Sequence, residues 1–185
     1  MSLAAPPPRH PHTRHARFNV EQFHRLCEAV PEQRLEPIDG EVLEVIAKGT
    51  RHSAVVNRLT RLITLFLAAR PDAALELRVE SPLELGPDSE PEPDLALVSL
   101  LADTDLEAHP TAADTRLVIE VADSSLRFDL EAKASLYREA GIGHYWVVDV
   151  LKPRLIPVLE PASAESPLQE LRGEVERLLA HIPPA

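Results

Sequence analysis

Residues 117–149 constrain the fold more than any other part of the sequence. They read LVIEVADSSLRFDLEAKASLYREAGIGHYWVVD, which predicts a strand, a polar turn, a helix that stops at a glycine, and a second strand. The near-continuous run of β-branched residues at the start is typical of a strand that is covered on both faces. We therefore expect an α/β protein with a mixed sheet flanked by helices.

Two charged residues interrupt the apolar pattern of this unit. Glu120 lies inside the first strand, and a buried carboxylate is costly unless a cation or several hydrogen bonds meet it. The helix is expected over 129–140, and at 100° per residue Lys133 falls near the centre of its apolar face, with Asp129 beside it. The sequence thus predicts a lysine that points toward the sheet, next to a strand that carries an unpaired glutamate.

The rest of the chain supplies further short elements. The Asp39-Gly40 pair is a strong two-residue turn signal and predicts a hairpin over 35–46. Apolar spacing and capping residues predict helices over 19–30, over 51–70 and from 166 onward. Strands are expected over 74–79, 82–85, 94–98, 144–149 and 155–159. There is no internal repeat, phosphate-binding loop or nucleophile elbow.

Length and composition limit the classes of protein that fit. A chain of 185 residues, 44% hydrophobic and 26% charged, suits one globular domain with tails. The single cysteine excludes an internal disulfide and a cysteine metal cluster. No apolar run approaches the roughly 20 residues of a membrane span, and the N-terminus lacks a signal-peptide core. We expect a cytoplasmic protein that does not contact a membrane.

The charge is uneven along the chain. The net charge of −11 argues against loose, sequence-independent adhesion to nucleic acid. Residues 1–18 nevertheless hold three arginines and no acidic residue, in a segment rich in proline and histidine. Such a tail can touch a phosphate backbone or form a disordered leader, and its composition favours the disordered leader.

Two acidic residues at consecutive strands are the candidates for chemistry. Asp94 follows a proline at the start of one strand, and Glu120 lies in the next strand. If the two strands pair, both carboxylates can face one point, which suits a hard divalent cation such as Mg²⁺. Lys133 nearby can stabilise developing charge or orient an attacking water. The chemistry of such a site is phosphodiester hydrolysis.

Each candidate also has an ordinary structural interpretation. Asp94 alone is an unremarkable strand start, and Glu36 on the hairpin can be a solvated strand edge. His52, in the first turn of the long helix, can be a capping or surface residue. Glu120 and Lys133 can form a structural ion pair, although such a pair adds little stability compared with apolar replacements.

The acid pair and lysine match the PD-(D/E)XK nuclease pattern with one departure. In that pattern the lysine stands two residues after the glutamate, on the same face of the strand, and here Ala122 occupies that position. Lys133 on the following helix is the natural substitute, because it lies on the expected buried face and has a long, flexible stem.

Over residues 19–160 the chain resembles the Uma2 family, which has a restriction-endonuclease-like fold. The resemblance is carried, in family order, by EPIDGE at 36–41, His52, Pro93-Asp94, Ile119-Glu120-Val121, Asp129 with Lys133 and Tyr137, and GIGHYWVVD at 141–149. Two positions depart from the family: Pro37 stands where leucine is usual, and Asp123 where serine is usual. Neither removes a candidate ligand.

The resemblance implies a metal-dependent endonuclease. Asp94, Glu120 and Lys133 would form its catalytic site, with Asp94 and Glu120 holding Mg²⁺ or Mn²⁺. Glu36 would be a further acid near the metal, and His52 would assist. The expected partner is nucleic acid, DNA above all, and a homodimer is expected because two strands need two sites.

The expected organisation is one endonuclease domain with two flanking segments. Residues 1–18 would be a disordered tail, 19–160 the restriction-endonuclease-like domain, and 161–185 a helical C-terminal extension. The alternative function is a catalytically silent module of the same fold that binds nucleic acid or protein, in which Glu120 and Lys133 form only a structural pair.

Overall fold

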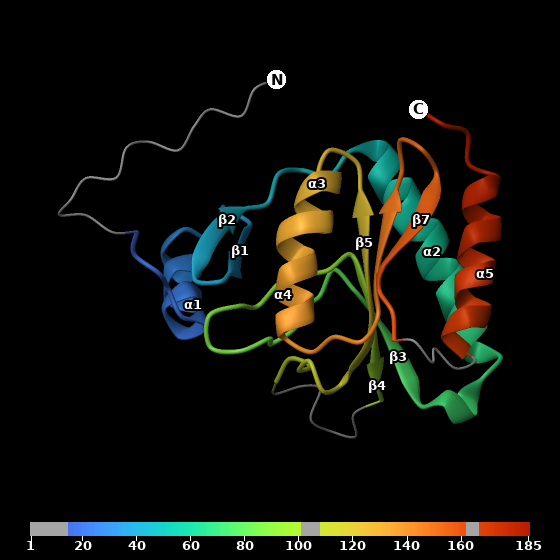
Figure 1. Ribbon diagram of the computed structural model, residues 1–185. Coiled ribbons are helices and arrows are strands. Elements are labelled where there is room, and N and C mark those ends of the chain that lie inside the picture. The colour runs from blue at the N-terminus through green and yellow to red at the C-terminus, as the bar shows by residue number, and fades with distance from the viewer. Residues whose placement is uncertain (1–14, 101–107, 162–166) are drawn as a thin grey trace.

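The structure is a computed structural model that describes residues 15–100, 108–161 and 167–185. A twisted sheet stands in the middle of the molecule, with helices on both faces, as Figure 1 shows. The expected disordered tail falls almost entirely on residues 1–14, which lie outside the described residues. The prediction of an α/β core with a mixed sheet flanked by helices is confirmed.

The central sheet has five strands in the spatial order β3-β4-β5-β6-β7. Strands β5 and β6 are parallel, and the other neighbours are antiparallel. The strand–helix–strand unit of 117–149 supplies the parallel pair, because its helix returns the chain to the same end of the sheet. The strands are β3 Leu75–Val79, β4 Leu95–Ser99, β5 Thr115–Ala122, β6 Tyr145–Asp149 and β7 Arg154–Leu159.

Two helices cover one face of this sheet. They are α2, Thr50–Ala68, and α5, Pro167–Ala180, which lie side by side at the right of Figure 1. Their apolar stripes meet the inner residues of β4, β5 and β6 in one core cluster, where Leu59, Ile63 and Leu171 are fully buried. The C-terminal helix is therefore packed into the core of the domain.

A single helical segment covers the other face, and it differs from the expected regular helix. It begins at α3, Leu126–Phe128, passes through the π-helical turn η2, Asp129–Lys133, and ends as α4, Ala134–Glu139. A π turn is wider than an α turn and is often found at functional sites. Here the wide turn keeps both of its end residues, Asp129 and Lys133, buried on the inner side.

The N-terminal part forms a separate small unit beside this helical segment. Helix α1, Val20–Ala29, is capped by Asn19 and Gln22 in a reciprocal capping box. The predicted hairpin is confirmed as β1, Leu35–Ile38, and β2, Glu41–Glu44, which form their own two-stranded sheet. Asp39 and Gly40 both have positive φ, 49° and 71°, as a two-residue hairpin turn requires.

The strand predicted over 82–85 is wrong. These residues form only an isolated bridge, Glu84 with Thr111, and otherwise belong to a turn that closes on itself. Leu83 and Leu85 donate their amides to Pro91 and Ser89 within the same loop, so no neighbouring strand is needed to satisfy them. Pro82 contributes no amide to a ladder, which also disfavours a strand here.

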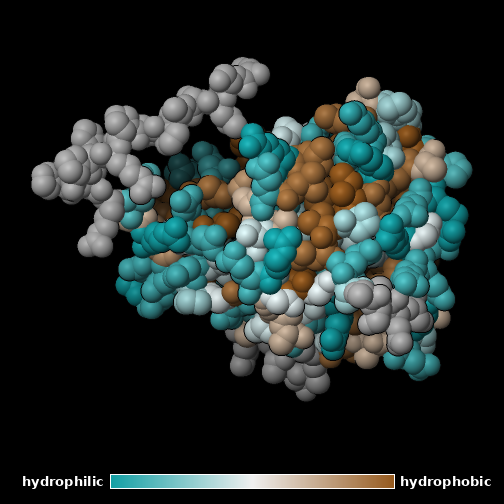
Figure 2. Space-filling view, viewed as in Figure 1, coloured by the Kyte–Doolittle hydropathy of each residue, from teal (hydrophilic) through white to brown (hydrophobic). Residues whose placement is uncertain are grey.

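The surface is mixed, with one apolar area in the view of Figure 2. Hydrophobic residues gather in the middle of that view, between α4 and α5, where the edge strand β7 lies. Residues 155–159 of this strand are only partly buried. Among the helices of the described residues, none has the length and apolarity that a crossing of the lipid bilayer requires.

Candidate functional site

A cavity of about 400 Å³ opens where the hairpin, the sheet and the π turn meet. All five residues singled out from the sequence line it: Glu36, His52, Asp94, Glu120 and Lys133. Its wall is strongly acidic, since seven carboxylates face only three lysine or arginine cations. The acids are Glu36, Glu44, Glu92, Asp94, Glu120, Asp123 and Asp129, and the cations are Arg34, Lys48 and Lys133.

The two candidate acids lie on the same face of adjacent strands. Leu95 pairs with Ile119 in the antiparallel ladder of β4 and β5, so Asp94 stands opposite Glu120. Side chains at opposed positions of paired strands share a face, and this one is covered by the π turn and α4. The sequence-based expectation that strand pairing brings these carboxylates to one place agrees with this register.

Glu120 is held by two donors from the covering helix. Lys133 Nζ and Tyr137 Oη each donate to Glu120 Oε1 over 2.8 Å. Burial raises the pKa of Glu120 above its ordinary value, against the opposing effect of the Lys133 ammonium. For Lys133, burial alone would lower the pKa, but the carboxylates of Glu120 and Glu36 outweigh burial and raise it. The lysine is therefore charged and fixed inside the cavity.

Glu36 joins this group from the hairpin. Its Oε1 lies 3.2 Å from Lys133 Nζ and accepts a hydrogen bond of 3.0 Å from the amide of Glu92. Glu36 is 6% exposed, so its interpretation as a solvated strand edge is wrong. The reason is that the hairpin forms a wall of the cavity, and among the β1 residues Glu36 directs its side chain into it.

Asp94 makes contacts through both carboxylate oxygens. Oδ2 accepts the amide of Val121 at 2.7 Å, and Oδ1 accepts Lys48 Nζ at 2.5 Å. His52 Nε2 lies 3.1 Å from the same Oδ1. Burial by itself would raise the pKa of Asp94, but the His52 ring and the Lys48 ammonium outweigh it and lower the pKa to about 2. Asp94 is an anion at neutral pH.

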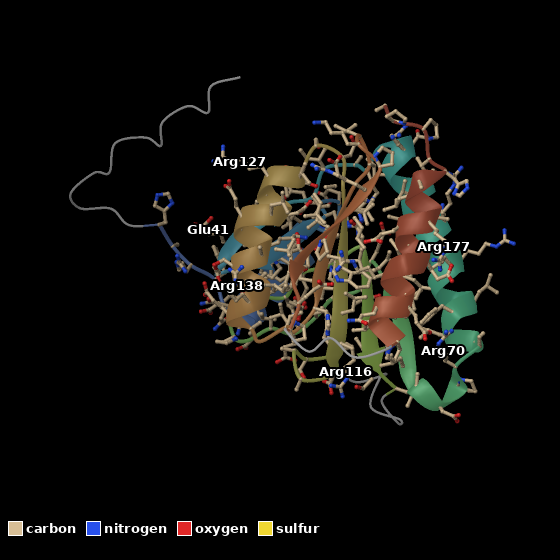
Figure 3. All side chains as sticks on the ribbon, turned by 45° about the vertical axis from the view of Figure 1, so that its right-hand side comes forward. Glu41, Arg70, Arg116, Arg127, Arg138 and Arg177 are labelled. Atoms are coloured by element: carbon tan, nitrogen blue, oxygen red, sulfur yellow. The ribbon has the colours of Figure 1, made fainter. Side chains whose placement is uncertain are left out.

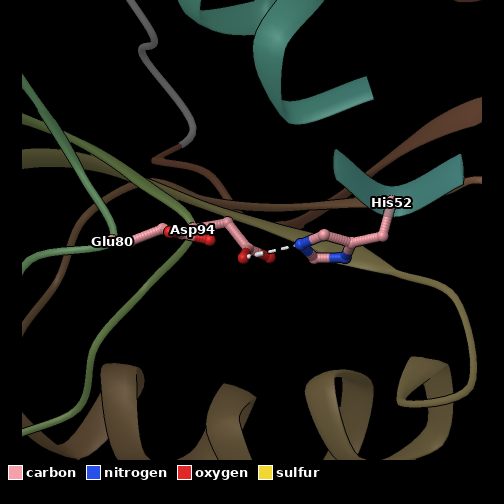
Figure 4. A group of neighbouring side chains, drawn as sticks. All are labelled: His52, Glu80 and Asp94. Atoms are coloured by element: carbon pink, nitrogen blue, oxygen red, sulfur yellow. Dashed lines mark ion pairs between the residues drawn. The ribbon is translucent and has the colours of Figure 1, made fainter. Parts of the chain in front are cut away.

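His52 directs a buried nitrogen into this cluster without a well-formed hydrogen bond. The residue is 6% exposed, and no hydrogen bond from the described residues reaches its buried Nε2. Figure 4 shows this nitrogen directed at the Asp94 carboxylate. One ligand atom from each of His52, Glu80 and Asp94 lies within 4.8 Å of the other two. Imidazole nitrogen and carboxylate oxygen together suit a divalent cation such as Mn²⁺, so the donors present fit a metal.

Three residues of this site escaped the sequence-based assignment of site residues. Lys48 lies in the loop between β2 and α2, where no periodicity marks a position as inward. Glu80 follows β3 with a φ of 47°, a left-handed conformation that glycine or asparagine would signal but glutamate does not. Asp129, which is 3% exposed and accepts the Ser125 hydroxyl at 2.7 Å, could have been found from its place on the Lys133 face of the helix.

Comparison with known proteins gives one family and a fold. The family model Uma2, described as "Putative restriction endonuclease", matches residues 20–182. Among solved structures, the chain is similar to one titled a putative nuclease belonging to DUF820 from Anabaena variabilis ATCC 29413. That likeness has 14% identity and a TM-score of 0.63, and it covers 90% of this chain and 99% of the other. None of the curated proteins matches the chain.

Proposed function

The chain belongs to the Uma2 family, and on that premise we propose that it is a metal-dependent endonuclease that hydrolyses phosphodiester bonds of nucleic acid. One observation carries the proposal. Asp94 and Glu120 stand opposite each other on paired strands, and Lys133 Nζ lies 2.8 Å from Glu120, all at the wall of one cavity. Two carboxylates suit a hard divalent cation, and such a cation together with a lysine suits phosphodiester hydrolysis.

Each side chain has a role that follows from its contacts. Asp94 and Glu120 would hold Mg²⁺ or Mn²⁺ through their carboxylate oxygens, with Glu36 as a further acid and His52 assisting on the Asp94 side. When bound, such a cation supplies Lewis-acid polarisation of the phosphoryl group and lowers the pKa of water. The Lys133 ammonium stabilises the negative charge that develops on the phosphate, because it is already fixed and desolvated. Tyr137 orients Glu120 through its hydroxyl.

We expect the groups in the cavity to contribute more to the binding of nucleic acid than the charges on the outer surface. Figure 3 labels Arg70, just after α2, Arg127 on α3 and Arg177 on α5, and all three lie on the outside of the molecule. Arg70, Arg127 and Arg177 pair with Glu170, Glu131 and Glu174, so their charges are largely neutralised. We therefore expect DNA to bind by contact of a phosphate with the metal and the cavity lysines, and binding to depend on the metal.

The proposal includes a homodimer, because cleavage of both strands of a duplex needs two sites. The partly buried apolar residues of the edge strand β7, in the hydrophobic area of Figure 2, are a surface that a second copy can cover. Sedimentation of the purified protein measures this directly, and a monomer at micromolar concentration in the presence of duplex would contradict it.

A specific observation also favours the alternative, a silent binding module. Lys133 satisfies Glu120 and Glu36, and Lys48 satisfies Asp94, so the acids have partners without any metal. Buried ion pairs of this kind are compatible with a structural role. Catalysis is the property that separates the two functions.

Nicking of supercoiled plasmid tests the proposed activity. We expect the wild-type protein to nick plasmid in Mg²⁺ or Mn²⁺ and to be inactive in excess chelator. Glu120→Gln keeps an oxygen that can accept from Lys133 and Tyr137 but loses the charge for the cation, so nicking should slow by about 100-fold. Equal nicking by wild type and variant, purified in parallel, would indicate a contaminant and favour the silent module.

A further inference from the structure

Lys48 occupies a position that a metal ion would also suit. Its Nζ donates to Glu80 Oε1 over 2.6 Å and to Asp94 Oδ1 over 2.5 Å, so one ammonium bridges the two carboxylates. The Lys48 side chain is 20% exposed, and Asp94 is almost fully buried. The positive charge therefore reaches inward from the rim of the cavity to the buried acid.

The ammonium does not satisfy the third member of this cluster. His52 Nε2 lies 3.1 Å from the oxygen that Lys48 contacts, yet it receives no hydrogen bond from the described residues. Its contact with Asp94 is an ion pair only when the ring is protonated, and it does not have the geometry of a hydrogen bond. A cation with open coordination positions would use this nitrogen together with both carboxylates, since all three ligand atoms lie within 4.8 Å of one another.

Backbone contacts hold the donors in place, whereas Lys48 lies on a loop and contacts the acids through its side chain. His52 lies in the first turn of α2, and the Glu80 amide donates to the Asp94 carbonyl, so backbone contacts hold these donors together. Lys48 comes from 45–49, which belong to neither a helix nor a strand. Its long side chain can leave the cluster without the loss of a regular element.

We propose that Lys48 is a displaceable internal cation, and that His52, Glu80 and Asp94 are ligands of the divalent cation that takes its place. This inference rests on the proposed metal dependence and adds Glu80 and His52 to the ligand set. Competition between the ammonium and the metal lowers the metal affinity of the protein. Lys48 thereby sets the cation concentration at which the site fills.

Calorimetric titration with Mn²⁺ tests the competition. Lys48→Met removes the ammonium and keeps the length and apolar stem, so we expect the Kd for Mn²⁺ to fall about tenfold, the change that ~1.4 kcal/mol produces. Lys152→Met is the matched control: it removes the same charge from an exposed turn between β6 and β7, and its Kd should equal that of wild type. Melting temperature gives a second readout, because Mn²⁺ should stabilise Lys48→Met more than wild type.

Glu80→Gln tests the ligand set. If Glu80 binds the metal, this variant should weaken Mn²⁺ binding by about tenfold. Glu76→Gln is its control, because Glu76 lies in β3, four residues before Glu80, and pairs with Arg78 instead of Lys48. A Kd that is unchanged in Glu80→Gln would remove Glu80 from the ligands and overturn that part of the proposal.

The outcomes separate this inference from the proposed function. Mn²⁺ binding by wild type with equal or weaker binding by Lys48→Met would overturn the competition and leave the metal-dependent nuclease intact. Absence of Mn²⁺ binding in both proteins would overturn the inference and the metal dependence together. Tighter binding in Lys48→Met alone, with Lys152→Met unchanged, is the supporting result.

Discussion

Replacing Lys133 by methionine should slow plasmid cleavage by about a thousandfold, the upper range for the loss of one preorganised donor to a developing negative charge. The same change leaves Glu120 and Glu36 buried without their shared cation. We therefore expect the metal-free protein to lose about 3–5 kcal/mol of unfolding free energy. Cleavage assays and urea unfolding in chelator measure the two effects separately.

The control and the contradicting outcomes for Lys133 are distinct. Lys152→Met should leave both cleavage and stability unchanged, since Lys152 is exposed in a turn. Mn²⁺ binding should remain measurable in Lys133→Met, because the lysine is not a ligand. A large loss of stability with full cleavage activity would assign Lys133 a structural role only. Unchanged stability would contradict the buried pairing that the structure shows.

Replacing Asp94 by alanine should abolish detectable cleavage. Asp94 is a metal ligand both in the proposed function and in the Lys48 inference. The Kd for Mn²⁺ should therefore rise by more than about a hundredfold, which is more than the loss of a residue that only contacts a ligand costs. The substitution also leaves the buried Val121 amide without its acceptor, which costs about 1–3 kcal/mol. Titration calorimetry and the plasmid assay measure these effects.

A second substitution at the same position separates folding from function. Asp94→Asn keeps a carbonyl oxygen that can accept the Val121 amide, so it should fold more stably than Asp94→Ala and remain inactive. Asp72→Ala, at an exposed position after α2, should behave as wild type in every assay. Cleavage by Asp94→Asn at the wild-type rate would contradict a role for the Asp94 charge.

The sequence predicted the parts of the site that lie on regular elements. Strand alternation and helical spacing repeat, so an acid or a lysine out of place in an apolar pattern can be recognised, as with Glu120 and Lys133. The residues on loops could not be placed in this way. Lys48 lies on the loop between β2 and α2, and Glu80 lies on the loop after β3. These loops bring Lys48 to Asp94 and Glu80, but loops have no periodic sequence pattern from which such contacts can be predicted.

The sequence pattern also did not predict the start and the π turn of the helix between the parallel strands. Apolar spacing predicted a regular helix from Asp129, yet the structure starts it at Leu126 and widens it at the π turn. Composition does not distinguish a π turn from an α turn, because the same residue types occur in both. The strand predicted over 82–85 failed for a related reason: short apolar segments beside prolines fit a closed turn as well as a ladder.

The π turn has a consequence for residue spacing. Its hydrogen bonds span one residue more than those of an α-helix, so the segment between Asp129 and Lys133 holds one residue in excess of a regular helix. Deletion of a single exposed residue there, such as Glu131, would therefore leave a regular α-helix with Asp129 three residues before Lys133. Residues three apart share a helix face, so Asp129 and the lysine would still face the same side. Sequences related to this chain should accordingly tolerate the loss of one residue in this turn.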